Sequence, residues 1–100
     1  MTTVEIRLPR LAGTRDAARQ LVDKAGLDES GVAVFLSARL LTTGTVSFAD
    51  ELIKDLQERG VASVTMAGSP ARFEQMLKTA AARRRYGGLR IATDSDLVGA

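Results

Sequence analysis

The sequence of 100 residues contains no cysteine, no histidine and no tryptophan. The absence of cysteine excludes disulfides, a thiolate nucleophile and thiolate metal sites. The absence of histidine excludes a Ser-His-Asp triad and removes the commonest general base and zinc ligand. Any catalysis would rest on carboxylates, lysines or hydroxyl groups. We therefore expect a protein that is not an enzyme, that uses no metal or cofactor, and that acts by binding.

Aromatic residues and long apolar runs are also scarce. Aromatics make up 4% of the chain, so aliphatic side chains must fill the core. No run approaches 18 apolar residues, so we expect no membrane-spanning helix, and the first residues lack an apolar signal segment. The net charge of +2 is too small to indicate nucleic-acid binding by itself. These features predict a cytoplasmic domain that does not enter a membrane.

The first half of the chain shows strand and helix patterns in turn. Apolar and polar residues alternate over 3–8, which predicts a half-buried strand. A helix over 15–25 is expected after the N-cap Thr14. The continuous apolar run 32–36 predicts a strand that is covered on both faces.

A second helix is expected to open with Ser47 as its N-cap and to end at Gly60. Asp50 or Glu51 would complete a capping box with Ser47. Pairs spaced i,i+4 are expected on the outer face of this helix. These pairs are Asp50 with Lys54 and Asp55 with Arg59.

The remaining elements follow the same alternation. A strand is predicted over 61–66, and a helix is predicted to start at Pro70 with Ser69 as its N-cap. The pair Gly87-Gly88 is expected to end this helix before a short strand over 89–92. The order βαβαβαβ predicts an α/β domain over 1–92, with about four strands in a mostly parallel or mixed sheet and helices packed against it. Residues 93–100 are expected to form a flexible tail.

The polar stretch after the second predicted strand is the first candidate site. Ligands of open α/β sheets gather at the carboxyl ends of strands, and a helix start favours an anion. Ser47 or Thr45 would accept a phosphate of about −1.5 to −2 charge at this position. The simpler interpretation is that Ser47 only caps the helix and the threonines only form a loop. A partner surface here would include Thr42, Thr43, Gly44, Asp50, Glu51 and Lys54.

Two further binding modes remain open. A basic set could contact nucleic acid, although cations near a helix C-terminus are explained more simply by the helix dipole. This set consists of Arg72, Arg83, Arg84 and Arg85. The strand over 3–8 could pair with its own copy in a homodimer. Asp50 and Glu51 are adjacent, so they point about 100° apart on a helix and are not expected to act as an acid–base pair.

The string SFADEL at 47–52 resembles the bacterial STAS-like family, which is related to the STAS domain of anti-sigma-factor antagonists. The resemblance covers about residues 14–82 in the order and spacing of its elements. It implies a compact sheet with helices on one side and a non-enzymatic role in partner switching. The implied partner is a protein with the fold of histidine-kinase-like ATPases.

In the antagonists, a serine at the start of the second helix is phosphorylated by this kind of partner, and the modified form releases it. The matching position in this chain is Val46, which cannot accept a phosphate. The resemblance therefore moves the expected phosphoacceptor to Ser47 or Thr45. The end of the preceding strand also differs, because Ser37-Ala38 stands where the antagonists have Asp-Phe.

Overall fold

Four parallel strands form the main sheet, and they lie across it in the order in which they occur in the chain. They are β1 (Thr3–Arg7), β3 (Ala33–Ser37), β5 (Ser63–Ala67) and β6 (Leu89–Ile91). The structure is a computed structural model that describes residues 3–27 and 31–92. The predicted tail 93–100 lies outside the described residues. The predicted order of the four main strands and three helices is confirmed, and so is the mostly parallel sheet.

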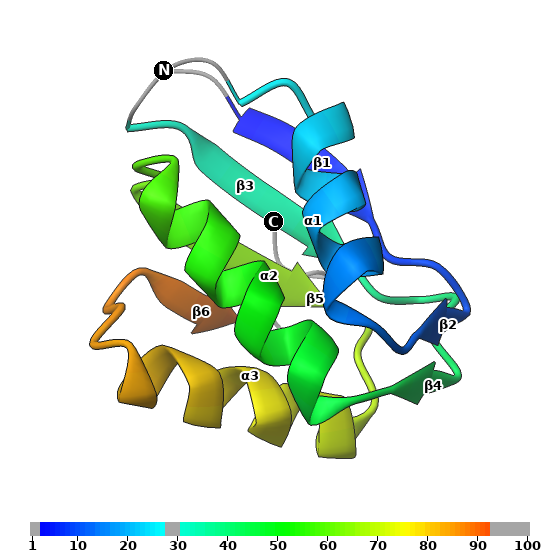
Figure 1. Cartoon of the computed structure of the whole chain (residues 1–100). Coiled ribbons are helices and arrows are strands. Elements are labelled where there is room, and N and C mark those ends of the chain that lie inside the picture. Colours follow the sequence, from blue (N-terminus) through cyan, green and yellow to red (C-terminus); the bar gives the residue numbers. More distant parts are fainter. Residues whose placement is uncertain (1–2, 28–30, 93–100) are drawn as a thin grey trace.

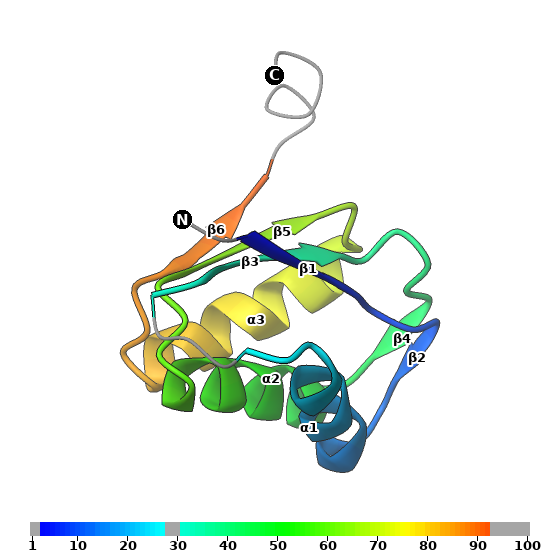
Figure 2. The ribbon, with the colours of Figure 1, turned by 90° about the horizontal axis from the view of Figure 1, so that it is seen from above.

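Three helices connect successive strands and lie on the same side of the sheet (Figures 1 and 2). They are α1 (Arg15–Lys24), α2 (Val46–Glu58) and α3 (Ala71–Arg83). The central helix α2 packs against α1 on one side and α3 on the other. The fold therefore has two layers, one of helices and one of strands. No helix of the described residues is long and apolar enough to cross a membrane.

The core fills the space between these layers. Strand residues such as Val34, Leu36, Val64 and Met66 point toward the helices and are buried. The prediction that the strand over 32–36 is covered on both faces is wrong. Its outward side chains are only half-buried, and no element of the described residues covers the outer face of the sheet (Figure 2).

A second, two-stranded parallel sheet was not predicted. It pairs β2 (Leu11–Ala12) with β4 (Thr43–Gly44) beyond the carboxyl ends of β1 and β3. The amide of Thr42 donates to the carbonyl of Arg10 at 2.9 Å, and the amide of Thr45 donates to the carbonyl of Ala12 at 3.0 Å. This small sheet fixes the loop that leads into α2, which is the segment of the first candidate site.

Two predicted helix ends are shifted. Pro70, rather than Ser69, is the N-cap of α3, and no side chain caps this helix. The helix ends before Gly87-Gly88 because Arg85 adopts a left-handed conformation with φ of 54°. The amides of Arg85 and Tyr86 then donate to the carbonyls of Ala82 and Ala81, which gives the hydrogen bonds of a Schellman motif.

Candidate functional site

Thr45, not Ser47, is the N-cap of α2. Its hydroxyl accepts a hydrogen bond from the amide of Phe48 at 3.1 Å and donates one to the carbonyl of Gly13 at 3.0 Å. The predicted capping box built on Ser47 is therefore wrong, because the side chain that caps α2 is that of Thr45, which accepts from the amide of Phe48. Thr45 is one of the two expected phosphoacceptors, and its hydroxyl already links the start of α2 to Gly13, in the segment before α1. A phosphate on it would replace the hydrogen that it donates to Gly13 and so break that bond.

Ser47 is exposed in the first turn of α2. Its hydroxyl makes no hydrogen bond with the part of the chain that the structure describes. The first amides of a helix lack intrahelical partners, and this end carries the positive end of the helix dipole. A phosphate on Ser47 would be accessible to a kinase and would add charge where the helix favours it. These features favour Ser47 over Thr45 as the acceptor.

Asp50 joins all three helices. Its carboxylate accepts hydrogen bonds from Arg84 Nε at 2.9 Å, Arg84 Nη2 at 2.7 Å and Arg15 Nη1 at 2.9 Å. The hydrogen bonds from Arg84 and then from Arg15 hold the pKa of Asp50 far below its usual range. The predicted outward pair of Asp50 with Lys54 is wrong, because Asp50 points along the helix layer toward its neighbours.

Glu51 is also turned inward, and its side chain is 2% exposed. It lies 3.6 Å from Arg15, 3.8 Å from Arg19 and 3.9 Å from Lys54. The prediction that Glu51 belongs to an exposed partner surface is therefore wrong. Lys54 remains partly exposed beside it.

A second buried carboxyl lies one turn further along α2. Asp55 is 8% exposed, so the predicted outward pair with Arg59 is wrong, and Arg59 binds Asp23 of α1 instead. Burial and a hydrogen bond to Glu51 raise the pKa of Asp55 to about 6. Burial opposes the charge of Glu51, but the hydrogen bond from Asp55 and three nearby cations outweigh it and lower the pKa of Glu51.

This buried pair has a structural explanation. Glu51 Oε2 and Asp55 Oδ2 lack hydrogen-bond partners in the described structure. A proton shared between the two carboxyls supplies a partner for one of them and removes one buried charge. Both side chains are almost fully buried. Among the described residues, no group of three or more His, Cys, Asp or Glu could hold a metal ion.

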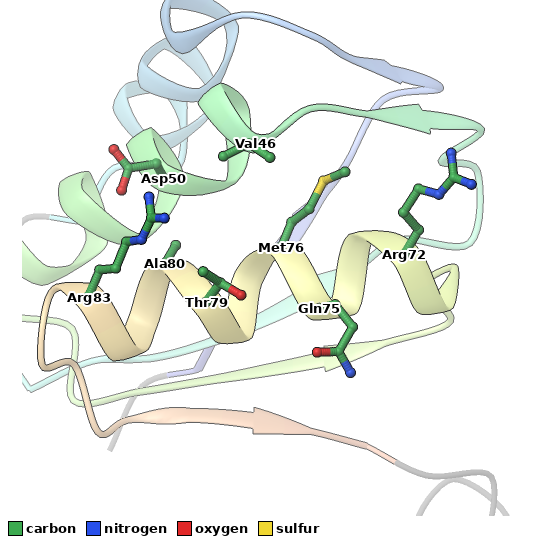
Figure 3. Close-up of a pocket in the computed structure, with 8 residues that line it drawn as sticks. All are labelled: Val46, Asp50, Arg72, Gln75, Met76, Thr79, Ala80 and Arg83. Atoms are coloured by element: carbon green, nitrogen blue, oxygen red, sulfur yellow. The ribbon is translucent and has the colours of Figure 1, made fainter.

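A groove of about 340 Å³ runs between α2 and α3 (Figure 3). Val46 of α2 and Met76 of α3 point toward one another across it, and Ala80 lies beside them. Arg72 and Arg83 stand near the two ends of α3, with Arg83 turned toward the side of Asp50. The groove is lined by Val46, Asp50, Arg72, Gln75, Met76, Thr79, Ala80 and Arg83.

The cations of this groove are spaced along the helix. Arg72 and Arg83 are eleven residues apart, which is about 16 Å along an α-helix. Neither makes an ion pair with the described residues. Val46 is 56% exposed although it is apolar. The groove thus offers an apolar centre between two positive charges.

The four arginines of the predicted nucleic-acid set have different environments. Arg84 binds Asp50, and its carbonyl accepts a hydrogen bond from the side chain of Gln57 at 2.9 Å. Arg85 forms the left-handed turn after α3. Only Arg72 and Arg83 line the groove. The set is therefore divided between a structural role and the groove.

The loop residues Thr42, Thr43 and Gly44 lie at a smaller hollow of about 150 Å³, which Arg72 also lines. Thr42 donates its hydroxyl hydrogen to the carbonyl of Arg10 at 2.9 Å, while Thr43 is exposed. Arg72 of the predicted basic set therefore borders both the groove and the loop of the first candidate site. The loop and the basic set are alternative sites in the prediction from sequence, and the fold places them next to each other.

Sequence reasoning missed the middle of the groove. Met76 has the spacing of a buried residue of the third helix, but it is only partly buried and faces Val46. Gln75 and Thr79 gave no signal because single polar residues on a helix are unremarkable. The one available signal was an apolar residue, Val46, at the exposed start of a helix.

Comparisons with known proteins add no assignment to this site. No family model, no curated protein and no solved structure matches the chain.

Proposed function

We propose that the protein is a non-enzymatic regulatory domain that binds a protein partner through the loop 42–47 and the groove between α2 and α3. The observation that carries the proposal is the groove itself, in which the exposed Val46 and the partly buried Met76 lie between Arg72 and Arg83. Exposed apolar surface bordered by charge is typical of protein-binding sites. The partner would bring apolar side chains to Val46 and Met76 and carboxylates to the arginines.

Phosphorylation of Ser47 is the proposed control of this binding. The hydroxyl is exposed next to Val46, so a phosphate would enter the rim of the partner surface. It would repel the carboxylates that the two arginines attract, and like charges in an interface are costly. The resemblance to anti-sigma-factor antagonists suggests a histidine-kinase-like ATPase as the partner and the kinase.

The test combines intact-mass analysis with binding. The protein purified from its own cells is expected to carry one added phosphate on Ser47 in a fraction of the molecules. Partner binding is expected to weaken about tenfold or more with Ser47→Asp and to remain with Ser47→Ala. Equal binding of the two variants would reject the phosphorylation control.

The groove is tested separately from the control. Arg72→Glu and Arg83→Glu are each expected to weaken partner binding, because each reverses one charge of the groove. Lys24→Glu makes the same charge change at the far end of α1, and it should leave binding unaltered. Loss of binding in all three variants would mean that overall charge, rather than the groove, attracts the partner.

Nucleic-acid binding is the second candidate, and it depends on the same Arg72 and Arg83. It predicts affinity that falls steeply with salt, because each phosphate contact releases counterions. Binding of a single-stranded oligonucleotide that is abolished by Arg72→Glu and falls steeply with added salt would favour this candidate. The engagement of Arg84 with Asp50 weakens it, since one of its four cations is already neutralised.

A further inference from the structure

The outer face of the main sheet is a second candidate binding surface. The helices of the described residues all lie on the opposite face (Figure 2). Parallel sheets occur almost only with both faces covered. Phe35 lies on the outer face of the central strand β3 and is only half-buried. The sheet therefore carries an aromatic side chain on a face that its own described elements leave open.

A hollow of about 380 Å³ marks the carboxyl end of this face. Phe35, Ser37 and Leu40 line it together with Glu5, Arg7 and other residues of β1 and the loop after β3. Leu40 is 64% exposed. The face thus carries a half-buried Phe35 and, at its carboxyl end, an exposed Leu40, and exposed apolar side chains are typical of a surface that a protein covers.

The charges on this face have a definite order. The strand registers place Glu5, Phe35, Thr65 and Arg90 side by side in one row across the sheet. Glu5 stands on the edge strand β1, and Arg90 stands on the opposite edge strand β6. Both residues are exposed, and Glu5 also makes a solvent-exposed ion pair with Arg7 of the same strand, with 3.5 Å between Glu5 Oε2 and Arg7 Nε. The row therefore has an acid at one end, a base at the other, and uncharged residues between them.

This order fits a second copy of the same chain. Two sheets can stack face to face around a two-fold axis that runs parallel to the strands. That axis reverses the row, so Glu5 of each copy faces Arg90 of the other and Phe35 faces Thr65. A two-fold axis perpendicular to the strands would instead place Glu5 against Glu5 and Arg90 against Arg90. The charges thus distinguish the two arrangements.

We propose that the protein forms a homodimer in which the outer faces of two sheets stack around a two-fold axis parallel to the strands. The face measures about 19 Å by about 17 Å from standard strand spacings, or about 320 Å² per copy, which is below the range of stable protein interfaces. The dimer is therefore expected to be reversible, with dissociation between micromolar and millimolar concentrations. It differs from a dimer made by edge pairing of β1.

The dimer is independent of the proposed function. The groove is lined by residues of α2 and α3, which lie on the other side of the sheet from this face. Two grooves would point outward from the dimer in opposite directions. Loss of dimerisation leaves each groove intact, so failure of one proposal is distinguishable from failure of the other.

The test is sedimentation equilibrium of charge-reversal variants over micromolar to millimolar concentrations. The natural chain is expected to dimerise. Glu5→Arg and Arg90→Glu are each expected to raise the dissociation constant about tenfold or more, because each creates two like-charge contacts. An equal mixture of the two variants restores an opposite-charge pair at both positions, so it should form a mixed dimer as tightly as the natural chain.

The control is Lys24→Glu, which reverses one charge on α1 and should leave dimerisation unchanged. All of the substituted side chains are exposed, and thermal unfolding checks that each variant folds. A natural chain that stays monomeric at all these concentrations would overturn the proposal. A dimer that is as tight in either single variant as in the natural chain would also overturn it, because such a dimer could form by edge pairing of β1 without Arg90. A mixture of the two variants that fails to associate would overturn it as well.

Discussion

Arg84 binds Asp50 with two parallel hydrogen bonds, and this pair joins the end of α3 to the first turns of α2. Arg15 completes the contact from α1, so one carboxylate holds the three helices in register. The same carboxylate lines the groove between α2 and α3. The geometry of the proposed partner site therefore depends on an ion pair that the partner does not need to touch.

Asp50→Asn tests this contact. It is expected to lower the free energy of unfolding by about 2 kcal/mol at pH 7, the usual range for hydrogen bonds to charged groups. The pKa of Asp50 is lower in the folded protein, so its contribution is present above about pH 4 and is lost as the pH falls further. Denaturant unfolding at pH 7 and pH 2 measures this difference.

The matched control for that experiment is Glu58→Gln near the end of the same helix, at an exposed residue without an ion pair among the described residues. Its effect should stay within about 0.5 kcal/mol. If Asp50→Asn were no more damaging at pH 7 than Glu58→Gln, the three-helix contact would not contribute to stability.

Asp55 should have the opposite dependence on pH. Its folded pKa of about 6 lies above the usual value, so the folded state binds an extra proton between about pH 4 and 6 and loses stability as the pH rises through this range. Asp55→Asn keeps a hydrogen-bond donor beside Glu51 at every pH. The variant is expected to be about 1–2 kcal/mol more stable than the natural chain at pH 8 and to show no such gain at pH 4.

Urea unfolding across this pH range checks the prediction for Asp55. A stability gain that is equal at pH 4 and pH 8 would show that titration of Asp55 is not its cause.

Arg85 holds a left-handed conformation that glycine adopts without strain. Arg85→Gly is therefore expected to raise the free energy of unfolding by about 1 kcal/mol. Arg83→Gly lies two residues earlier, inside the helix, and should lower it by about 1 kcal/mol instead. Thermal unfolding of both variants gives the two signs, and a loss of stability in both would contradict the assigned helix end.

Gly44 lies against the ring of Phe73, and a Cβ atom at this position would overlap Phe73 Cδ1 and lie 2.8 Å from Cε1. Phe73 in turn packs against Phe48 with ring centroids 6.2 Å apart. Gly44→Ala is expected to lower the free energy of unfolding by about 1–3 kcal/mol, the range for overpacked sites.

Gly13→Ala is the matched control for Gly44→Ala, because a Cβ atom there meets nothing within 4 Å. Denaturant unfolding should separate the two variants clearly. Equal stability would show that the loop before α2 yields without disturbing the aromatic pair.

Periodicity alone predicted most of the fold. The order of strands and helices and the parallel sheet follow from alternation, helical spacing and short connections. The inward turn of Asp50 and Glu51 could not be predicted, because their partners Arg15, Arg19 and Arg84 are distant in the chain. The N-cap was misplaced since Thr45 and Ser47 are both good caps, and only the contact of Thr45 with Gly13 distinguishes them.

The apolar run 32–36 is a second feature whose surroundings could not be predicted from the sequence. Its composition correctly predicts a central strand, but composition cannot tell which face the helices of the same chain will cover. All three helical connections lie on one face of the sheet. Phe35 alternates with the buried Val34 and Leu36, so it lies on the other face. The candidate groove was likewise hidden, because it forms only where α2 and α3 meet.

Site-specific photo-crosslinking in the source cells tests the central claim, that a protein partner binds in the groove. A photoreactive residue at Thr79, inside the groove, is expected to yield one adduct of defined mass, and the same residue at Lys24 on α1 is expected to yield none. The Thr79 adduct should disappear when Arg72→Glu and Arg83→Glu are added to the same chain. No adduct at Thr79, or an adduct that is equally abundant at Lys24, would contradict the proposed site.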